Sequence, residues 1–306
     1  MTAGEETRPG HRFVVEEGIP SAPSSLDSYI GQYVDFLRRE ATVNGGVPVP
    51  VAEILEHFDV EYQTGEIEGD RQGFKFSGSG LPYQVVFIEE GDKETRRRFS
   101  LGHELIELLF EALNDGMLSL QMTEACNGPC KERLCDQGAA RLLMPEERYR
   151  DEVHSRPVSF DTASKLASLF DVSFLAALLR MVELTSRPFL LIAWRKKLNP
   201  TQKERHSSSQ LSFPGMGQGG PAKKLRVEWR RWTEEPSDQY VPTDTSVPDR
   251  SMIRRAFKEG QKLSGTERLK LGHAFEGTFD MEAMPVQLGE NQYVLSLLDT
   301  SHLLEK

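Results

Sequence analysis

Apolar and polar residues recur at helical spacing in two neighbouring segments between residues 98 and 145, RFSLGHELIELLFEAL and CKERLCDQGAARLLMP. Residues four apart lie on the same face of a helix. The spacing therefore predicts two amphipathic helices with a middle stretch between them. The polar positions of interest on these helices are His103, Glu104, Glu107, Glu132 and Asp136.

The pattern ahead of these helices predicts two more helices and a small sheet. Apolar residues recur at helical spacing from Leu26 to about Arg39. A second helix is predicted at 51–58. It follows Pro50, and proline is favoured in the first turn of a helix. Short runs bounded by turn residues predict strands at 60–62, 73–76 and 83–88. The first 25 residues are polar and rich in Pro, Ser and Glu, which predicts a disordered tail.

The pattern after residue 145 predicts two short helices, 160–170 and 173–184, with the spacing of a helix-turn-helix pair. Exposed basic positions on this pair are few, mainly Lys165 and Arg180. DNA binding needs a basic surface. We therefore favour two packed core helices over a DNA-binding pair. The triplet Arg96–Arg98 is predicted to precede the first site helix and to solvate the junction there, with binding of an acidic partner as the alternative.

The last third of the chain changes character at about residue 186. A Gly/Ser-rich loop is predicted at 207–221, and residues 251–257 fit either a helix or a strand. Strands are predicted at 189–194, 225–232, 275–279 and 293–298. The expected fold class is α+β, with a first unit over 26–185 and a smaller β-rich C-terminal domain over 186–306. We find no catalytic motif in that domain.

Composition narrows the classes of function. The 306 residues are 38% hydrophobic and 27% charged, as in soluble globular proteins. A net charge of -10 argues against general nucleic-acid affinity, which usually needs a basic excess. No apolar run approaches the roughly 20 residues that span a bilayer, and the first residues contain no apolar signal core. The sequence therefore predicts a cytoplasmic protein without a membrane partner.

The three cysteines lie close together, at Cys126, Cys130 and Cys135. An odd number fits a reducing compartment, and their spacing is not a standard zinc motif. We favour ordinary free thiols, and the alternative is a redox or auxiliary metal role for Cys126 and Cys130. His154 follows the second site helix, and we expect it to be a surface residue rather than a member of the site.

The segment HELIE resembles the HExxH helix of zinc peptidases but departs from it at one position. In HExxH two histidines four apart hold the metal, and the intervening glutamate activates water. Here Glu107 stands where the second histidine is expected, while His103 and Glu104 match. A carboxylate can bind zinc. An additional carboxylate makes the site harder and brings Mn²⁺ and Fe²⁺ into consideration beside Zn²⁺.

Taken together, RFSLGHEL and E-x-x-C-D-x-x-A-A-x-L-L-M-P resemble the ImmA/IrrE family of bacterial zinc metallopeptidases, over about residues 26–185. The resemblance implies a zincin-like domain with a helical subdomain. It also implies cleavage of a helix-turn-helix transcriptional repressor, which derepresses genes of mobile-element transfer, prophage or stress response. Position by position, it implies metal ligands at His103 and Glu132, a catalytic glutamate at Glu104, and support of His103 by Asp136.

Glu107 leaves three interpretations open. It binds the metal as a working ligand, or the site has lost its metal, or Glu107 points away and another group completes the site. Two functions remain accordingly. The chain is a metal-dependent endopeptidase that cuts a protein partner, or a peptidase-like module that binds a repressor or antitoxin without cutting it.

Overall fold

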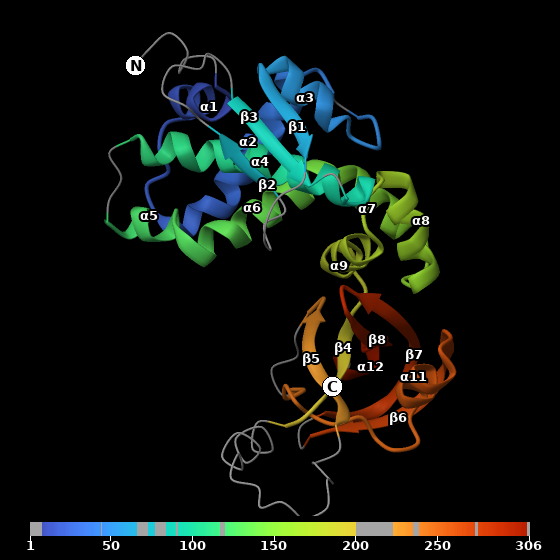
Figure 1. Ribbon diagram of the computed structural model, residues 1–306. Coiled ribbons are helices and arrows are strands. Elements are labelled where there is room, and N and C mark those ends of the chain that lie inside the picture. The colour runs from blue at the N-terminus through green and yellow to red at the C-terminus, as the bar shows by residue number, and fades with distance from the viewer. Residues whose placement is uncertain are drawn as a thin grey trace, which may run out of the picture. The chain divides into compact units, whose positions relative to one another are not determined.

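The computed structural model describes residues 8–43, 45–65, 73–76, 84–89, 91–116, 120–199, 223–234, 239–272 and 275–304. The chain is α+β, as the sequence predicts (Figure 1). It divides into two compact units, Met1–Glu152 with Ser164–Arg180, and Val153–Ala163 with Met181–Lys306. The chain therefore passes between the units three times, whereas the sequence pattern suggests a single boundary near residue 185. The predicted Gly/Ser-rich loop, 207–221, lies outside the described residues.

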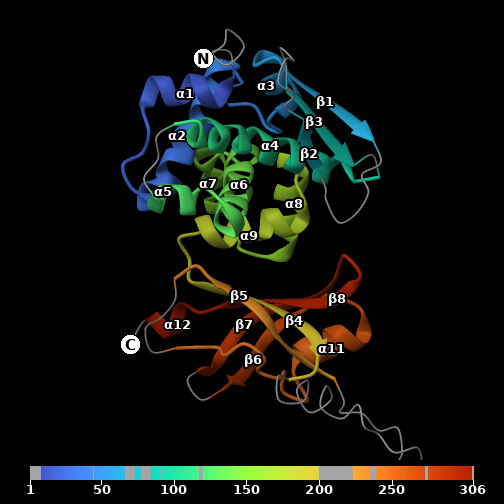
Figure 2. The same cartoon turned by 60° about the vertical axis from the view of Figure 1, so that its left-hand side comes forward.

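Helix α4 (Glu94–Asn114) lies at the centre of the first unit and carries the first group of candidate residues. Most of its surface is buried, and Leu105, Leu109 and Phe110 are fully so. Helix α6 (Gly128–Leu143) packs against α4 (Figures 1 and 2). Both site helices predicted from the sequence are thus confirmed, and they are neighbours in space.

A glycine allows α6 to approach its neighbours closely. A Cβ atom on Gly138 would lie 2.8 Å from Ile106 Cγ1 on α4 and 2.9 Å from Ile30 Cγ2 on α2 (Leu26–Glu40). Carbon atoms prefer separations of about 3.5–4.0 Å. Any side chain at this position would therefore push the helices apart. The close approach sets the distance between the candidate residues on α4 and those on α6.

A three-stranded sheet lies beside these helices. Its order is β1 (Val60–Gly65), β3 (Gln84–Glu89), β2 (Gly73–Phe76), with β1 parallel and β2 antiparallel to β3. Helix α3 (Val51–His57) packs against β1, and α4 packs against β3. The predicted helix 51–58 and the three predicted strands are confirmed with shifts of a few residues.

The prediction of a disordered tail is wrong from Pro9 onward. Residues Pro9–Glu17 form helix α1, and a 3₁₀ turn covers Pro23–Ser25. The segment is polar overall, but Phe13 is only 1% exposed and packs among aromatic rings of α2. One buried aromatic side chain anchors the helix, which average composition does not reveal. Helix α1 packs on α4, where a Cβ atom on Gly10 would lie 2.2 Å from the carbonyl oxygen of Leu108.

The arginine triplet lies inside α4 rather than ahead of it, because the helix begins at Glu94. Arg96 and Arg97 form local ion pairs with Asp92 and Glu94. Arg98 reaches further. It donates to the backbone oxygens of Val49 at 3.0 Å and Asp171 at 3.1 Å, and it pairs with the Asp171 carboxylate at 3.1 Å.

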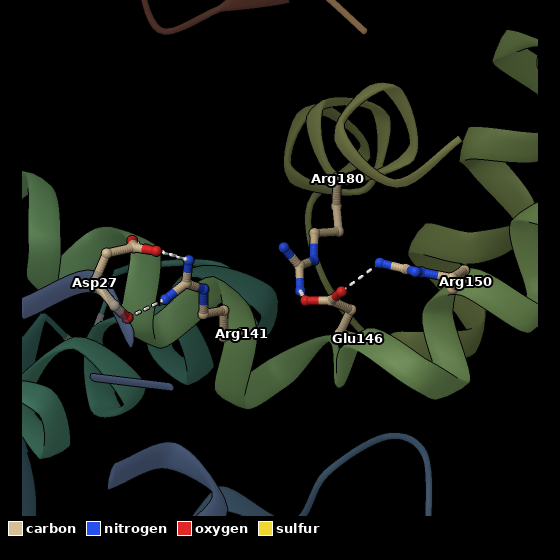
Figure 3. Close-up of polar contacts among 5 residues, drawn as sticks. All are labelled: Asp27, Arg141, Glu146, Arg150 and Arg180. Atoms are coloured by element: carbon tan, nitrogen blue, oxygen red, sulfur yellow. Dashed lines mark hydrogen bonds and ion pairs between the residues drawn. The ribbon is translucent and has the colours of Figure 1, made fainter. Parts of the chain in front are cut away.

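The remaining helices of this region are α5 (Leu120–Ala125), α7 (Glu146–His154), α8 (Phe160–Phe170) and α9 (Phe174–Leu184). The helices predicted at 160–170 and 173–184 are confirmed. Arg180 on α9 is only 3% exposed, and its guanidinium lies 3.9 Å from the Glu146 carboxylate (Figure 3). Arg180 is therefore not available on the surface, which leaves this pair with one basic residue fewer for binding DNA.

Ion pairs also fix α6 against α2. Arg141 on α6 donates to both carboxylate oxygens of Asp27, at 2.9 and 2.8 Å, and to the Asp27 backbone oxygen at 2.7 Å (Figure 3). Nη2 contacts the carboxylate and Nη1 contacts the backbone oxygen, so the planar guanidinium is restricted in orientation as well as distance. This contact helps to hold α6 in place along α4.

The second unit contains a five-stranded antiparallel sheet in the order β5-β4-β8-β7-β6. Its strands are β4 (Phe189–Lys197), β5 (Lys224–Trp232), β6 (Leu263–Leu271), β7 (Phe275–Leu288) and β8 (Asn291–Asp299). The four predicted strands are confirmed. Strand β6 was not predicted, because it is an edge strand with mostly exposed residues. Strand β7 continues through Pro285, which has no backbone N–H. The pairing of β7 with β6 ends at Ala283, so Pro285 has no hydrogen bond to donate to β6.

Helix α11 (Met252–Glu259) resolves the ambiguity at residues 251–257 in favour of a helix. The Ser251 side chain accepts a hydrogen bond from the Arg254 N–H, and Gly260 ends the helix in the left-handed conformation. These are the preferred residue types for the two caps. Helix α11 packs on the sheet through Ile253 and Ala256. Within the described residues, no helix is long and apolar enough to cross a membrane.

Candidate active site

His103 lies between two carboxylates of α6. Its Nδ1 is 3.0 Å from Asp136 Oδ1, and its Nε2 is 3.5 Å from Glu132 Oε2. Glu132 and Asp136 are one helical turn apart, so both project from the same face of α6. The structure thus brings together three of the residues that the sequence singles out, one from α4 and two from α6.

The contact with Asp136 orients the imidazole. An Nδ1–H that donates to the Asp136 carboxylate leaves Nε2 with its lone pair toward Glu132, the arrangement in which a histidine binds a metal. Burial alone would lower the pKa of His103, but the hydrogen bond and charge of Asp136, with the charges of Glu104 and Glu132, outweigh burial and raise it. The side chain of His103 is 17% exposed, whereas those of Glu132 and Asp136 are 61% and 58% exposed. Solvent therefore reaches these three side chains from the side of α6.

Glu104 follows His103 on α4 and is only 6% exposed. Its charge contributes to the raised pKa of His103. A catalytic role of Glu104 stays a prediction.

Glu107 is held by a residue that the sequence analysis does not single out. The Lys131 ammonium, on α6, forms an ion pair and hydrogen bond with Glu107 Oε1. The side chains of Lys131 and Glu107 are 18% and 25% exposed, so the pair lies deeper than Glu132 and Asp136. Burial alone would lower the pKa of Lys131, but the hydrogen bond and charge of Glu107 raise it. Lys131 is therefore charged and neutralises Glu107.

These residues fit a divalent metal in part. Two ligands about 2.1 Å from one tetrahedral metal are about 3.4 Å apart, and the 3.5 Å between His103 Nε2 and Glu132 Oε2 agrees with this. Glu107 is of a suitable type, but its carboxylate is engaged by Lys131. Over the part of the chain that the structure describes, no group of three or more His, Cys, Asp or Glu residues is arranged to hold a metal ion. The role of Glu107 as a ligand stays a prediction.

Of the remaining candidates, the three cysteines and His154, Cys135 lies close enough to Glu107 for that charge to act on its thiol. Cys126 and Cys135 are fully buried and Cys130 is half-buried, all three as free thiols. Burial raises the pKa of the Cys126 thiol, with a smaller effect of Cys130, and raises the pKa of Cys135 as well. Thiols that resist ionisation are poor nucleophiles. His154 is exposed, as expected of a surface residue.

Sequence reasoning missed Lys131, although a signal for it exists. Once Glu107 replaces a histidine, the helix interface holds one more negative charge, and a nearby cation is needed to balance it. Lys131 directly precedes Glu132 in the sequence, so it lies on α6 beside the residues that face α4. The sequence thus indicates that a balancing cation is needed near Glu107, but not which residue supplies it.

Comparisons with known proteins agree with this arrangement. Residues 55–182 match the family described as the IrrE N-terminal-like domain of M78 peptidases. Over 172 residues the chain is 30% identical to the radiation response metalloprotease IrrE of Deinococcus deserti, a match covering 55% of each protein. The match thus spans little more than half of that relative's length. In fold, the chain is similar to a solved structure of a Mycobacterium tuberculosis transcriptional regulator, with a TM-score of 0.54 and 12% identity, covering 99% of this chain and 84% of that one.

The match of residues 55–182 to the IrrE N-terminal-like domain confirms the resemblance to the ImmA/IrrE family found in the sequence.

Proposed function

We propose that the first unit is a zincin-like, metal-dependent endopeptidase that cuts a regulatory protein. The observation that carries this proposal is the position of His103 between Asp136 and Glu132. An imidazole fixed by one carboxylate, with its free nitrogen directed toward another, is a usual arrangement of metal ligand and outer support. The name of the Deinococcus deserti relative, a radiation response metalloprotease, is consistent with it.

In this proposal His103 and Glu132 would hold the metal, and Glu107 would complete the ligand set after leaving Lys131. A bound Zn²⁺, or the harder Mn²⁺ or Fe²⁺, would supply Lewis-acid chemistry for the hydrolysis of a peptide bond. Glu104 would be the proton acceptor for the attacking water and the proton donor for the leaving amine. Asp136 keeps the imidazole in one tautomer throughout.

The substrate is a protein, and we propose a helix-turn-helix transcriptional repressor whose cleavage derepresses stress-response genes. An extended segment of it pairs with a free edge of the three-stranded sheet, since strands β1 and β2 are the edges. A surface groove with a volume of about 440 Å³ runs along β1 and is lined by Ala52, Glu56, Val60, Glu61, Tyr62 and Gln63. Such a groove offers room for side chains of an added strand.

The test combines metal analysis with an unbiased cleavage assay. The purified full chain is incubated with Zn²⁺, Mn²⁺ or Fe²⁺, and metal content is measured after desalting. A peptide library prepared from cell protein is then digested and its new termini are identified by mass spectrometry. We expect one bound metal and a defined set of cleavages. Glu104→Gln should keep the metal and lose the cleavages, and the surface variant Glu147→Gln should keep both. A wild-type chain that stays metal-free in excess of all three ions contradicts the proposal.

The ion pair between Lys131 and Glu107 favours a second candidate, a peptidase-like module that binds a regulator without cutting it. In that case the pair is a permanent substitute for metal ligation. A regulator that binds equally well to wild type and His103→Ala, without metal and without cleavage, would support this second function.

A further inference from the structure

Strand β1 forms one edge of the three-stranded sheet, and the groove of about 440 Å³ runs along it (Figure 2). Among the described strands β1 pairs with β3 alone, so the other side of its six-residue backbone is open to a further strand. Such an edge can bind an extended peptide. Helix α3 packs on β1, whereas α4, which carries His103 and Glu104, packs on β3 and β2. The edge next to the site helix is therefore β2, and β1 is the opposite edge.

The surface along β1 is acidic. Glu56 on α3 and Glu61 on β1 line the groove, and both side chains are exposed. Within the described ranges of the chain, neither carboxylate has an ion-pair partner. The sequence contains no lysine or arginine between Arg39 and Arg71. The segment that builds the groove therefore supplies negative charge without a lysine or arginine of its own to balance it.

Tyr62 adds an apolar surface beside these charges. It lines the same groove, and it is 45% exposed. The stem of a lysine or arginine can cover such a ring while its charged end meets a carboxylate. A second copy of β1 would instead bring the same carboxylates opposite each other, and like charges across paired strands are destabilising. Charge complementarity thus selects a basic partner rather than another copy of the chain.

We propose that β1 is a docking edge for an extended segment of a regulatory protein, with lysine or arginine at alternate positions. The segment adds a strand to β1, its cations meet Glu56 and Glu61, and their stems cover Tyr62. Because β1 is the edge opposite the site helix, this segment serves for docking, and the bond to be cut lies elsewhere in the partner. The inference rests on the proposed function for its partner, and it names the chemistry by which that partner is recognised.

The first experiment measures the binding of a labelled synthetic peptide to the full chain by fluorescence anisotropy, with a metal chelator present. The peptide alternates arginine with threonine and is long enough to span the six residues of β1. It should bind at least about 10-fold more tightly than a peptide with glutamate in place of arginine, because only the basic peptide matches the charge of the groove. Binding should weaken as salt is added, since exposed ion pairs are screened.

A pair of double variants locates the charge effect. Glu56→Gln combined with Glu61→Gln removes both charges and keeps the side-chain shapes, and it should weaken binding of the basic peptide at least about 3-fold. Glu124→Gln combined with Glu147→Gln is the matched control, since it changes the net charge equally at exposed positions of α5 and α7. The control should bind the peptide as wild type does. Equal melting temperatures of both variants and wild type show that the fold is kept.

Methylated peptides test whether the peptide pairs as a strand. Successive backbone amides of an extended peptide point to opposite sides, so methylation of every second amide blocks one side only. Of the two possible methylated peptides, one should lose binding and the other should keep it. Amide hydrogen exchange of the wild-type chain gives the position, because residues 60–65 should become protected when the unmethylated peptide binds.

The outcomes separate the docking edge from the proposed function. No preference for the basic peptide, or equal losses in the two double variants, overturns the docking edge and leaves metal-dependent cleavage standing on its own test. Retained binding of both methylated peptides, or no protection of residues 60–65, overturns it as well. If the basic peptide binds as described but the chain takes up no metal and cuts no protein, the docking edge stands and the endopeptidase proposal fails.

Discussion

Asp136 accepts a 3.0 Å hydrogen bond from His103 across the interface of α6 and α4. A carboxylate in this position fixes the ring orientation and the tautomer of a metal-binding histidine. Asp136→Ala should therefore weaken Zn²⁺ binding about 10- to 100-fold, as losses of such support typically do. Calorimetric titration of the full chain measures this effect, with the exposed Asp151→Ala on α7 as the control. Equal affinity of Asp136→Ala and wild type would remove the supporting role.

Gly138 limits how closely α6 can pack. A methyl group there would meet Ile106 and Ile30 at 2.8 and 2.9 Å, so Gly138→Ala should lower the free energy of unfolding by about 1–3 kcal/mol through overpacking. Gly31→Ala on α2 is the matched control, since the added Cβ atom would lie 4.0 Å from Arg141 Nη1, its nearest neighbour. That change should stabilise the helix by about 0.5–1 kcal/mol. Urea unfolding followed by far-ultraviolet circular dichroism measures both, and a stabilising Gly138→Ala would contradict the packing argument.

Arg98 links the start of α4 to Val49 and to the turn at Asp171. Arg98→Ala leaves two backbone oxygens and a carboxylate without this donor, and it should cost about 1–3 kcal/mol. Arg98→Lys should recover only part of the loss, because one ammonium cannot reproduce the planar fork. Arg96→Ala, which breaks the ion pair of Arg96 with Asp92, should change stability by less than about 1 kcal/mol, because the Arg96 side chain is about half exposed. Equal effects at both positions would show that Arg98 has no special role.

Glu267 gives the second unit a pH dependence of known sign. Burial raises the pKa of its carboxyl, an effect reduced by the hydrogen bond from the Met252 N–H and by Arg255. A raised folded pKa means that stability is fully present below the unfolded pKa and is lost as pH rises through the folded value. Glu267→Gln, which keeps an oxygen acceptor, should therefore gain stability relative to wild type as the pH rises above the pKa of the unfolded carboxyl.

Glu276 provides a control of opposite sign for Glu267. Hydrogen bonds from Lys270 and Arg268 lower the pKa of its carboxyl, so its contribution is present at neutral pH and lost on acidification. Glu276→Gln should thus lose stability relative to wild type at neutral pH and match it in acid. The three tryptophans, Trp194, Trp229 and Trp232, all lie in the second unit, so their fluorescence during urea unfolding reports on this unit. Identical pH profiles for Glu267→Gln and Glu276→Gln would contradict the opposite directions of the two pKa shifts.

The sequence predicts the elements whose burial follows a regular period. Helices α2, α4 and α6 bury apolar residues at helical spacing, and strands β4 and β8 bury continuous, mostly apolar runs, so the sequence pattern predicts both kinds of element. The sequence pattern does not predict strand β6, because its positions are mostly exposed. The pattern does not predict helix α1 either, because a single residue, Phe13, provides much of its contact with the rest of the unit.

The candidate site is predictable to the extent that its residues share a helix face. The spacing of Glu132 and Asp136 on one helix follows from the sequence, and the family resemblance indicates that they meet His103. The engagement of Glu107 by Lys131 does not follow from either, because it depends on how two helices face each other across an interface. Pairing across helices is set by packing, for which Gly138 is one determinant.

Helix α1 also decides where this protein can be shortened. Phe13 fills a space between Tyr29, Tyr33 and Phe36, with ring centroids 4.9, 5.2 and 5.3 Å away. A protein trimmed to begin at Leu26, the first residue of the obvious sequence pattern, would bring these rings into contact with water. Exposed aromatic clusters promote self-association. A soluble recombinant fragment of the first unit must therefore begin ahead of Pro9.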